Sequence, residues 1–388
     1  MKLKQLPEDF KVEELNEIKI SKDTDKYKIY SLTKKSIETF YLIGYLSKKN
    51  DIPFSNFGIA GLKDKHALTK QYFTIPSRYE IKTLKENNFK IEFLGYTDKA
   101  IELGDLKGNK FEITARDIKK GELDGIYKKA ESLKYQGIPN YFDSQRFGSV
   151  SNKEFIAKHI IKKDYESAVK IFLTRYTKFE KSNLKREKRI ILENWSNLSK
   201  IRLNNKALSK IVYEYIKTKD WLSAYKKIPQ NLREIFVSAY QSYLWNECVK
   251  SLLIGKVDKK KLYSIKYNIG SLMYYKDISK AELEDIQKRF SSISDNMQLS
   301  DTEERIISKV LSKEGLSTKD FDIRKTTGNF FKTHEREVIV IPSDFNISKH
   351  EIDELNDRGK NNRFKITVYF TLPKGSYATI VTKRIFNQ

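Results

Sequence analysis

Cysteine and histidine are scarce in this chain of 388 residues, which has one cysteine, Cys248, and four histidines. A single cysteine excludes an intramolecular disulfide and any zinc site built from several thiolates. The histidines (His66, His159, His334 and His350) are scattered, and none stands four residues from another. No local motif can therefore assemble a metal cluster. We expect neither a disulfide framework nor a bound metal.

Motifs for nucleotide cofactors and for serine nucleophiles are also missing. No G-x-G-x-x-G fingerprint follows a strand-like run, no Walker-type phosphate loop occurs, and there is no G-x-S-x-G elbow. No run approaches the roughly eighteen apolar residues of a transmembrane helix, and the opening "MKLKQLPEDFKVEEL" lacks the apolar core of a signal peptide. We expect a cytoplasmic protein that needs no cofactor and has no membrane partner.

Positive charge is in excess. The chain has 75 lysines and arginines against 51 aspartates and glutamates, a formal net charge of +24. A protein this basic commonly binds a polyanion, because neutralising phosphates releases condensed counterions. The alternative is that the lysine content only reflects a compositional bias of the source. Hydrophobic residues make up 39% of the chain, which is enough for a globular protein with sizeable cores.

The texture of the sequence changes along the chain. From 151 to 322 the apolar residues recur three and four apart, as in helices, and only Pro229 interrupts the span. On both sides stand short β-branched and aromatic runs typical of strands, such as "QYFTIP", "KFEITAR" and "KITVYF". Three consecutive domains would fit, but the C-terminal strands are too few for a core of their own. We therefore favour one sheet domain interrupted by a helical insertion.

An amphipathic helix is expected at 36–48, within the strand-rich N-terminal part. Its apolar face would carry Ile37, Phe40, Tyr41 and Gly44, which recur at helical spacing. This helix would cover one face of the N-terminal strands.

The stretch "IAGLKDKHALTKQYFTI" contains the strongest candidate for chemistry. Asp64 follows a strand-like run and stands between Lys63 and Lys65, with His66 next to it. Cations at close range lower the pKa of a carboxyl group by about 1–3 units, and an ionised aspartate can serve as a nucleophile or a base. Spacing alone favours the other interpretation, a loop aspartate in a surface ion pair.

Five blocks of sequence together resemble the TruD family of tRNA pseudouridine synthases. They occur in the family's order and are "LPEDFKVEE", "GLKDKHALTKQ", "LKGNKFEITAR", "PNYFDSQRFG" and "FTLPKGSYATIVTKRI". The fourth block departs from the family pattern at Asp143, where glycine is usual. If that glycine needs a positive φ, aspartate is among the more tolerant replacements.

The resemblance implies an α+β fold with a mixed, largely antiparallel sheet of the pseudouridine-synthase type. The catalytic domain would be discontinuous, formed by 1–151 and 320–388. A mainly helical domain specific to the family would be inserted at 152–319, and the two domains would flank a basic cleft for tRNA. We lean to a monomer, because no long apolar face is left unexplained.

The resemblance also implies the activity, conversion of uridine to pseudouridine in tRNA, at position 13 in this family. Asp64 would be the catalytic carboxylate, nucleophile or base, with Lys63 or Lys4 helping to keep it ionised. No metal or cofactor is required. The runner-up is a non-catalytic RNA-binding protein or RNA folding chaperone on the same scaffold, and a third possibility is a carboxylate–metal nuclease, which would need acids clustered near Asp64.

Further residues are implied at the substrate. The family pattern places Phe10, Asn109 and Tyr377 in contact with the substrate and Phe111 on the face of the target base, and Glu8 is a weaker candidate. Each also has a structural alternative: the two phenylalanines could be core residues, Asn109 could form a hairpin turn, and Glu8 could cap a turn. Gln145, Arg146 and Phe147 would support the site without touching the base.

Overall fold

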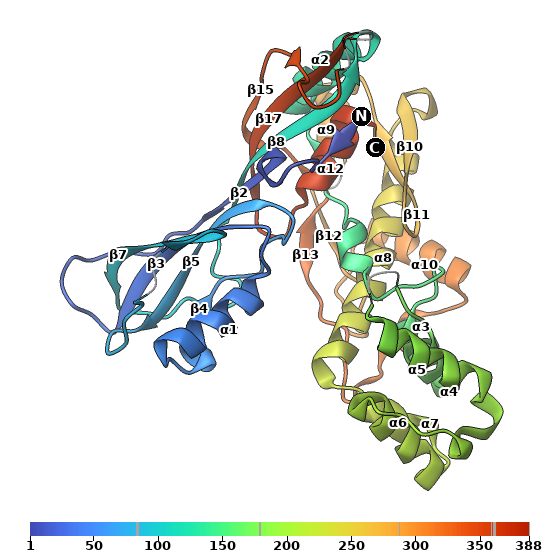
Figure 1. Cartoon of the computed structure of the whole chain (residues 1–388). Coiled ribbons are helices and arrows are strands. Elements are labelled where there is room, and N and C mark those ends of the chain that lie inside the picture. The colour runs from blue at the N-terminus through green and yellow to red at the C-terminus, as the bar shows by residue number, and fades with distance from the viewer. Residues whose placement is uncertain (83–84, 178–179, 287, 358, 360–361, 388) are drawn as a thin grey trace. The chain divides into compact units, whose positions relative to one another are not determined.

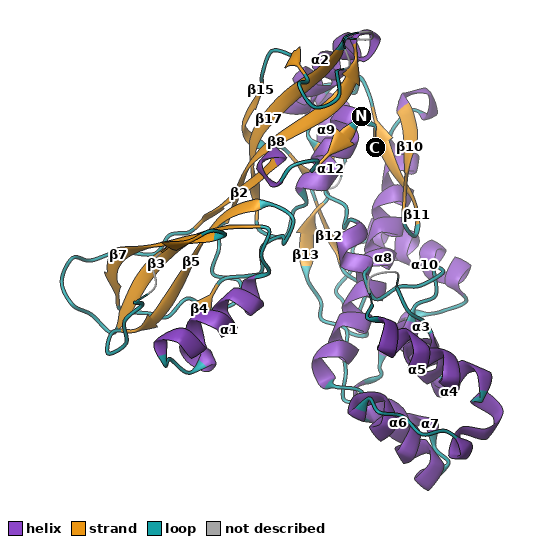
Figure 2. Cartoon of the chain, in the orientation of Figure 1, coloured by secondary structure: helices purple, strands orange, loops and turns teal. Residues whose placement is uncertain are grey.

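The computed structural model of the chain describes all residues except 83–84, 178–179, 287, 358, 360–361 and 388. It divides into two compact units, a sheet unit (Met1–Ile138 with Val340–Phe386) and a helical unit (Pro139–Ile339). Strands dominate the first and helices the second (Figure 2). In this division 139–151 and 320–339 belong to the helical unit. The expected domain boundaries at 151/152 and 319/320 remain predictions.

The sheet unit is built on one large twisted sheet (Figure 1). Its strand order is β15-β17-β8-β2-β5-β3-β7-β6, with β1 beside β8, β16 beside β17 and β4 beside β5. β2 and β5 run parallel, and the other neighbours are antiparallel. This is the mixed, largely antiparallel α+β sheet that the sequence predicted. The strands are β1 (Lys2–Leu3), β2 (Phe10–Leu15), β3 (Tyr27–Lys35), β4 (Gly58–Ile59), β5 (Leu68–Pro76), β6 (Lys85–Glu86), β7 (Phe89–Thr97), β8 (Gly108–Lys119), β15 (Ser343–Ile347), β16 (Glu351–Ile352) and β17 (Arg363–Pro373).

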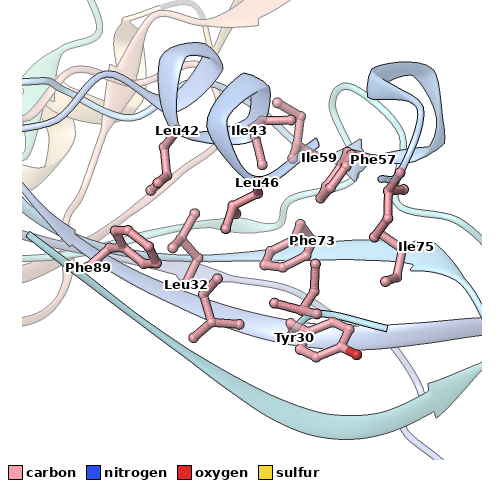
Figure 3. Packing of buried hydrophobic residues seen from close by; sticks show 13 residues of the cluster. Tyr30, Leu32, Leu42, Ile43, Leu46, Phe57, Ile59, Phe73, Ile75 and Phe89 are labelled. Atoms are coloured by element: carbon pink, nitrogen blue, oxygen red, sulfur yellow. The ribbon is translucent and has the colours of Figure 1, made fainter. Parts of the chain in front are cut away.

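Helix α1 (Thr39–Asn50) packs on the N-terminal strands, as expected, but through a different face. Leu42, Ile43 and Leu46 are buried against Phe73 and neighbouring strand residues (Figure 3). The predicted face was wrong at Phe40 and Tyr41, which are 44% and 69% exposed, whereas Ile37 does pack against this core. The aliphatic side chains fill the core beside β3 and β5, whereas Phe40 and Tyr41 lie on the outer side of α1.

Two further helices belong to the sheet unit. α2 (Leu123–Gln136) contacts β15 and α12 (Ala378–Phe386), and its buried residues Ile126, Ala130 and Leu133 recur at helical spacing.

Gly108 begins β8 where that strand approaches the end of β17. A Cβ there would lie 2.3 Å from the carbonyl oxygen of Leu372, so only glycine allows the approach.

The helical unit is centred on α8 (Gln230–Lys256), whose Tyr240, Leu244, Trp245 and Cys248 are buried. Around it pack α3, α10 and the hairpin β10–β11. Its helices follow the mostly helical pattern expected for 151–322, whereas the strands β10, β11 and β12 interrupt that pattern. The elements are α3 (Ile156–Ile161), α4 (Tyr165–Thr174), α5 (Ser182–Glu193), α6 (Lys206–Thr218), α7 (Trp221–Lys226), β10 (Leu262–Tyr267), β11 (Gly270–Tyr275), α9 (Lys280–Asp285), β12 (Arg289–Ser291), α10 (Asp301–Glu314), α11 (Arg324–Thr327) and β13 (Glu335–Glu337).

Candidate active site

The Asp64 loop connects β4 to β5, and hydrogen bonds from a buried lysine hold it in place. Lys34, near the end of β3, is fully buried and directs its ammonium group at three backbone carbonyl groups. Its Nζ donates to the oxygens of Ile37 at 2.8 Å, Asp64 at 3.1 Å and Lys63 at 3.4 Å. A single side chain thus fixes both the loop and the entry to α1.

Two groups hold the carboxylate of Asp64. Lys4 Nζ forms a direct ion pair with Oδ2, and the backbone N–H of His66 donates to Oδ1 at 2.9 Å. The second bond closes an Asx turn, in which the side chain caps its own loop. The Asp64 side chain is 20% exposed, so it is accessible without facing bulk water freely.

This environment keeps Asp64 ionised. Burial acts to raise its pKa, but the hydrogen bond and charge of Lys4 and the N–H of His66 outweigh that effect, and the pKa is lowered. Its ion-pair partner is Lys4, from a segment distant in sequence, whereas Lys63 pairs with Glu14. The setting expected for this aspartate is therefore present, with one of the two predicted lysines.

The pKa of Lys34 is lower than that of an ordinary surface lysine. Burial lowers its pKa to about 8, despite the favourable charges of Asp64 and Glu38, and the nearby charge of Lys63 lowers it further. The loop therefore depends on an ammonium group that loses its proton within reach of physiological pH.

The N-terminal segment that carries Lys4 is anchored by a buried ion network. Lys4 adopts a left-handed conformation (φ 55°), uncommon for a residue other than glycine. A few residues on, Asp9 accepts hydrogen bonds from the Leu6 N–H at 2.8 Å and from Arg116 Nε at 2.9 Å. Arg116 also binds Asp353 at 3.1 Å. The "PEDF" motif thereby fixes Lys4 over the Asp64 loop.

An aromatic cluster continues from Lys4. Its Nζ lies 3.9 Å from the centroid of the Phe10 ring, a cation–π contact. Phe10 meets Phe111 edge to face at 6.3 Å, and Phe111 meets Phe370 at 5.3 Å. Both Phe10 and Phe111 are buried, on the same face of β2 and β8. The structure thus joins Asp64, Lys4, Phe10 and Phe111 through consecutive contacts.

Lys63 turns away from Asp64 and pairs with Glu14 instead. This ion pair is almost fully buried, with side-chain exposures of 6% and 1%. Burying two charges is costly, and removing one partner of such a pair is strongly destabilising. The backbone N–H of Lys63 also donates to Thr39 Oγ1 at 3.3 Å. Lys63 therefore connects the loop to β2 and to the start of α1.

A row of polar side chains crosses the sheet beside this pair. Glu14 lies opposite Asn109 on β8, and Val12 lies opposite Thr69 on β5. Thr39 Oγ1 donates to Gln71 Oε1 at 3.2 Å. Several buried atoms in the row, namely Thr69 Oγ1, Gln71 Nε2 and Asn109 Oδ1, have no hydrogen-bond partner among the residues that the structure describes. Such atoms are suited to hydrogen bonds with a polar ligand or with water.

Two further residues were predicted at the substrate, Glu8 and Tyr377. Glu8 forms an exposed ion pair with Lys35, which lowers the pKa of Glu8. Tyr377 lies half-buried in the turn between β17 and α12, where its carbonyl oxygen accepts from the Ile380 N–H at 3.0 Å. The roles of both residues at the substrate remain predictions.

Sequence reasoning missed three residues that shape the site, Lys34, Glu14 and Asp9. Glu14 could have been found, because the alternation in "FKVEEL" places it on the buried face with Phe10 and Val12. A charged residue at an apolar position of a strand indicates a buried partner. Lys34 gave no comparable signal, since "TKKS" resembles an ordinary polar strand end.

Neither a metal site nor a membrane span is found in the described part of the chain. No group of three or more His, Cys, Asp or Glu side chains there is arranged to hold a metal ion. No described helix combines the length and apolar character needed to cross a bilayer.

Comparisons with known proteins identify the class of protein that has this sheet, this helical unit and the Asp64 loop. The family described as tRNA pseudouridine synthase D (TruD) matches residues 1–385. A probable tRNA pseudouridine synthase D 1 of Methanococcus maripaludis is 40% identical, covering 100% of both chains. A probable tRNA pseudouridine synthase D 2 of Methanocaldococcus jannaschii is 42% identical, covering 100% of this chain and 92% of that one.

A solved structure agrees with the sequence relatives. The crystal structure of the putative TruD of Methanosarcina mazei superposes with a TM-score of 0.74 at 27% identity, covering 100% of this chain and 93% of that one. The chain belongs to the TruD family of tRNA pseudouridine synthases. The family resemblance and the fold class predicted from the sequence are confirmed.

Proposed function

We propose that this tRNA pseudouridine synthase isomerises the uridine at position 13 of tRNA, with Asp64 as the carboxylate that acts on the ribose. The observation that carries the proposal is an ionised, accessible aspartate held by Lys4 and the His66 N–H, in the loop that bears the family motif. The family supports the activity, and position 13 and the role of Asp64 go beyond it.

The reaction rearranges bonds within one nucleotide. The bond from N1 of uracil to C1′ breaks, the freed base rotates, and a bond from C5 to C1′ forms. C5 loses its proton and N1 gains one, so no oxidant or other co-reactant is needed. A carboxylate that stays ionised can attack C1′ or remove a proton at C2′, and either step starts the exchange.

The surrounding residues would bind and shield the base. Phe10 and Phe111 supply an apolar wall, and Phe111 would stack on a uridine extruded from its helix, an interaction worth about 1–3 kcal/mol. Asn109 and Tyr377 would contact the nucleotide, with the unpartnered Oδ1 of Asn109 as an acceptor for uracil N–H. Lys63 would act through the loop that it fixes, and Glu8 is the least supported contact.

Tritium release tests the proposal. Unmodified tRNA labelled at C5 of uridine is incubated with the wild-type chain, and the released tritium is counted as each C5 proton is exchanged. We expect stoichiometric release from tRNA with uridine at position 13 and none when cytidine replaces it. Release that persists with cytidine at this position would contradict the position, although not the isomerase activity.

The competing reading is a non-catalytic RNA-binding protein or RNA folding chaperone. It predicts tRNA binding without tritium release from any substrate. Turnover in the presence of a chelator would dispose of a metal nuclease. We further propose that the chain acts as a monomer in the cytoplasm, which light scattering and cell fractionation would check.

A further inference from the structure

The helical unit contains a cavity of about 350 Å³ that shares no residue with the Asp64 site. It lies between α8 and the segment that follows α11, and the fourth family block contributes one residue to it. Its size is at the lower end of that of ordinary ligand pockets. The lining includes Arg146, Ser238, Gln241, Asn329, Phe330 and Lys332.

Phe330 presents an aromatic face at this cavity. Its side chain is 39% exposed, whereas the next residue, Phe331, is buried and packs edge to face on Phe321 with ring centroids 4.8 Å apart. The guanidinium of Arg324 lies 4.2 Å from the centroid of the Phe330 ring, and Lys332 Nζ lies 5.5 Å from it. Two cations thus flank one accessible ring, which combines stacking with attraction for an anion.

The polar groups around the ring are fixed by buried hydrogen bonds. Asn329 is buried, and its Oδ1 accepts from Arg233 Nη1 at 2.8 Å. Its Nδ2 is a buried donor without a partner in the described chain. Gln241 Nε2 donates to the carbonyl oxygens of Ile293 and Lys332, each at 2.8 Å. The segment that carries Phe330 is therefore held in place, with one amide donor still unused.

Arg146 extends the positive side of the cavity. Its Nε donates to Ser242 Oγ at 3.0 Å, and it also binds Ser238. One acid, Glu234, lies in the lining as well, and its carboxylate accepts from Gln230 Nε2 at 3.1 Å. Asp143 lies in the same family block as Arg146. Its backbone is extended (φ −105°), so the aspartate that replaces the family's glycine is not strained there.

We propose that this cavity binds an unpaired nucleotide of the substrate RNA, with the base stacked on Phe330 and the phosphate held by Lys332. The inference rests on the proposed function, which makes RNA the substrate. An unpaired base is required because a base inside a duplex has no free face to offer. The cavity admits one nucleotide, and the net charge of +24 favours a polyanion over a neutral ligand.

Substitution of the ring tests the stacking. The dissociation constant for unmodified tRNA, measured by fluorescence anisotropy at one fixed salt concentration, should rise about 5- to 100-fold in Phe330→Ala. Phe330→Trp keeps an aromatic face and should restore wild-type affinity. Tyr213→Ala removes an exposed ring from α6 in the same unit and should leave the affinity unchanged. Equal thermal unfolding midpoints would show that each variant is folded.

Two further experiments vary the charge of the cavity and the strandedness of the RNA. Lys332→Gln should make the plot of log affinity against log salt shallower by about one unit, as expected for one lost phosphate contact. A fully paired RNA duplex should bind wild type and Phe330→Ala equally. If Phe330→Ala binds tRNA like wild type, or loses duplex binding to the same extent, the inference is overturned. Wild-type tritium release is read separately, so failure of the proposed function would be recognised as such.

Discussion

The Asp64 site and the Phe330 cavity use positive charge in different ways. At Asp64 the lysines are matched to oxygens: Lys4 to the carboxylate, Lys63 to Glu14, and Lys34 to backbone carbonyl groups. At the cavity, Arg324 and Lys332 lie over an aromatic ring. Under the two proposals, chemistry depends on one charge held in a fixed place, whereas RNA binding depends on cations and ring faces that remain accessible.

Replacing Asp64 with Asn should have the largest effect. The amide can neither attack the ribose nor accept its proton, so the rate constant for tritium release should fall by at least about 10²–10⁴-fold. Binding of tRNA should be nearly unchanged, because the positive field is spread over many residues.

A matched control is Asp98→Asn, an exposed aspartate of the same sheet unit. It should retain wild-type turnover. Substantial tritium release by Asp64→Asn would remove Asp64 from the chemistry even though the family assignment would stand.

Breaking the buried ion pair should have the next largest effect, on stability. Glu14→Leu leaves the charge of Lys63 buried without a partner, which should lower the free energy of unfolding by about 3–5 kcal/mol. The double variant Glu14→Leu/Lys63→Met should recover much of this loss. Urea denaturation at neutral pH measures both.

The same segment offers an exposed pair for comparison. Glu17 and Lys107 have side-chain exposures of 72% and 69%, so Glu17→Gln should change the free energy of unfolding far less than Glu14→Leu does. Equal losses for Glu14→Leu and Glu17→Gln would mean that burial of the Glu14–Lys63 pair has no energetic importance.

Titration of Lys34 should have a smaller effect on stability and turnover, and this effect depends on pH. Its pKa of about 8 in the folded chain lies below the ordinary value of 10.5. Between these values the unfolded chain binds more protons, so this lysine makes the free energy of unfolding rise with pH in that window. Turnover should fall over the same range, because the loop loses the charge that holds its carbonyl groups.

Denaturation curves at several pH values check this coupling. Lys34→Met should remove the part of the rise between about pH 8 and 10.5 that Lys34 contributes, and Lys48→Met, at an exposed position of α1, should keep it. A wild-type slope retained in Lys34→Met would show that another group is responsible.

Much of the Asp64 site could be predicted because its residues lie in short motifs. "GLKDKH" and "PEDF" place Asp64 and Phe10 beside strand-like runs that the sequence pattern already indicates. Lys34 and Gln71 could not be assigned in this way, because their roles depend on which strands lie side by side. The antiparallel pairing of β3 with β5, which places Lys34 opposite Thr69 and Leu32 opposite Gln71, brings those residues to the loop, and no local pattern encodes it.

Elsewhere the sequence was less informative. The face of α1 was misassigned because Phe40 and Tyr41 are as apolar as the residues that are buried, and periodicity alone cannot choose between neighbouring stripes. No motif or periodicity in the sequence indicated the Phe330 cavity. Its residues come from around 146, 238 and 330, and only the folded helical unit brings them together.

A single-turnover experiment with enzyme in large excess over tRNA tests the division between chemistry and binding most directly. At saturating enzyme we expect Phe330→Ala to release tritium at the wild-type rate, with only the half-saturating concentration raised, and Asp64→Asn to release none while it still binds the RNA. If Phe330→Ala stays slow at saturation, or Asp64→Asn turns over at the wild-type rate, the division is contradicted.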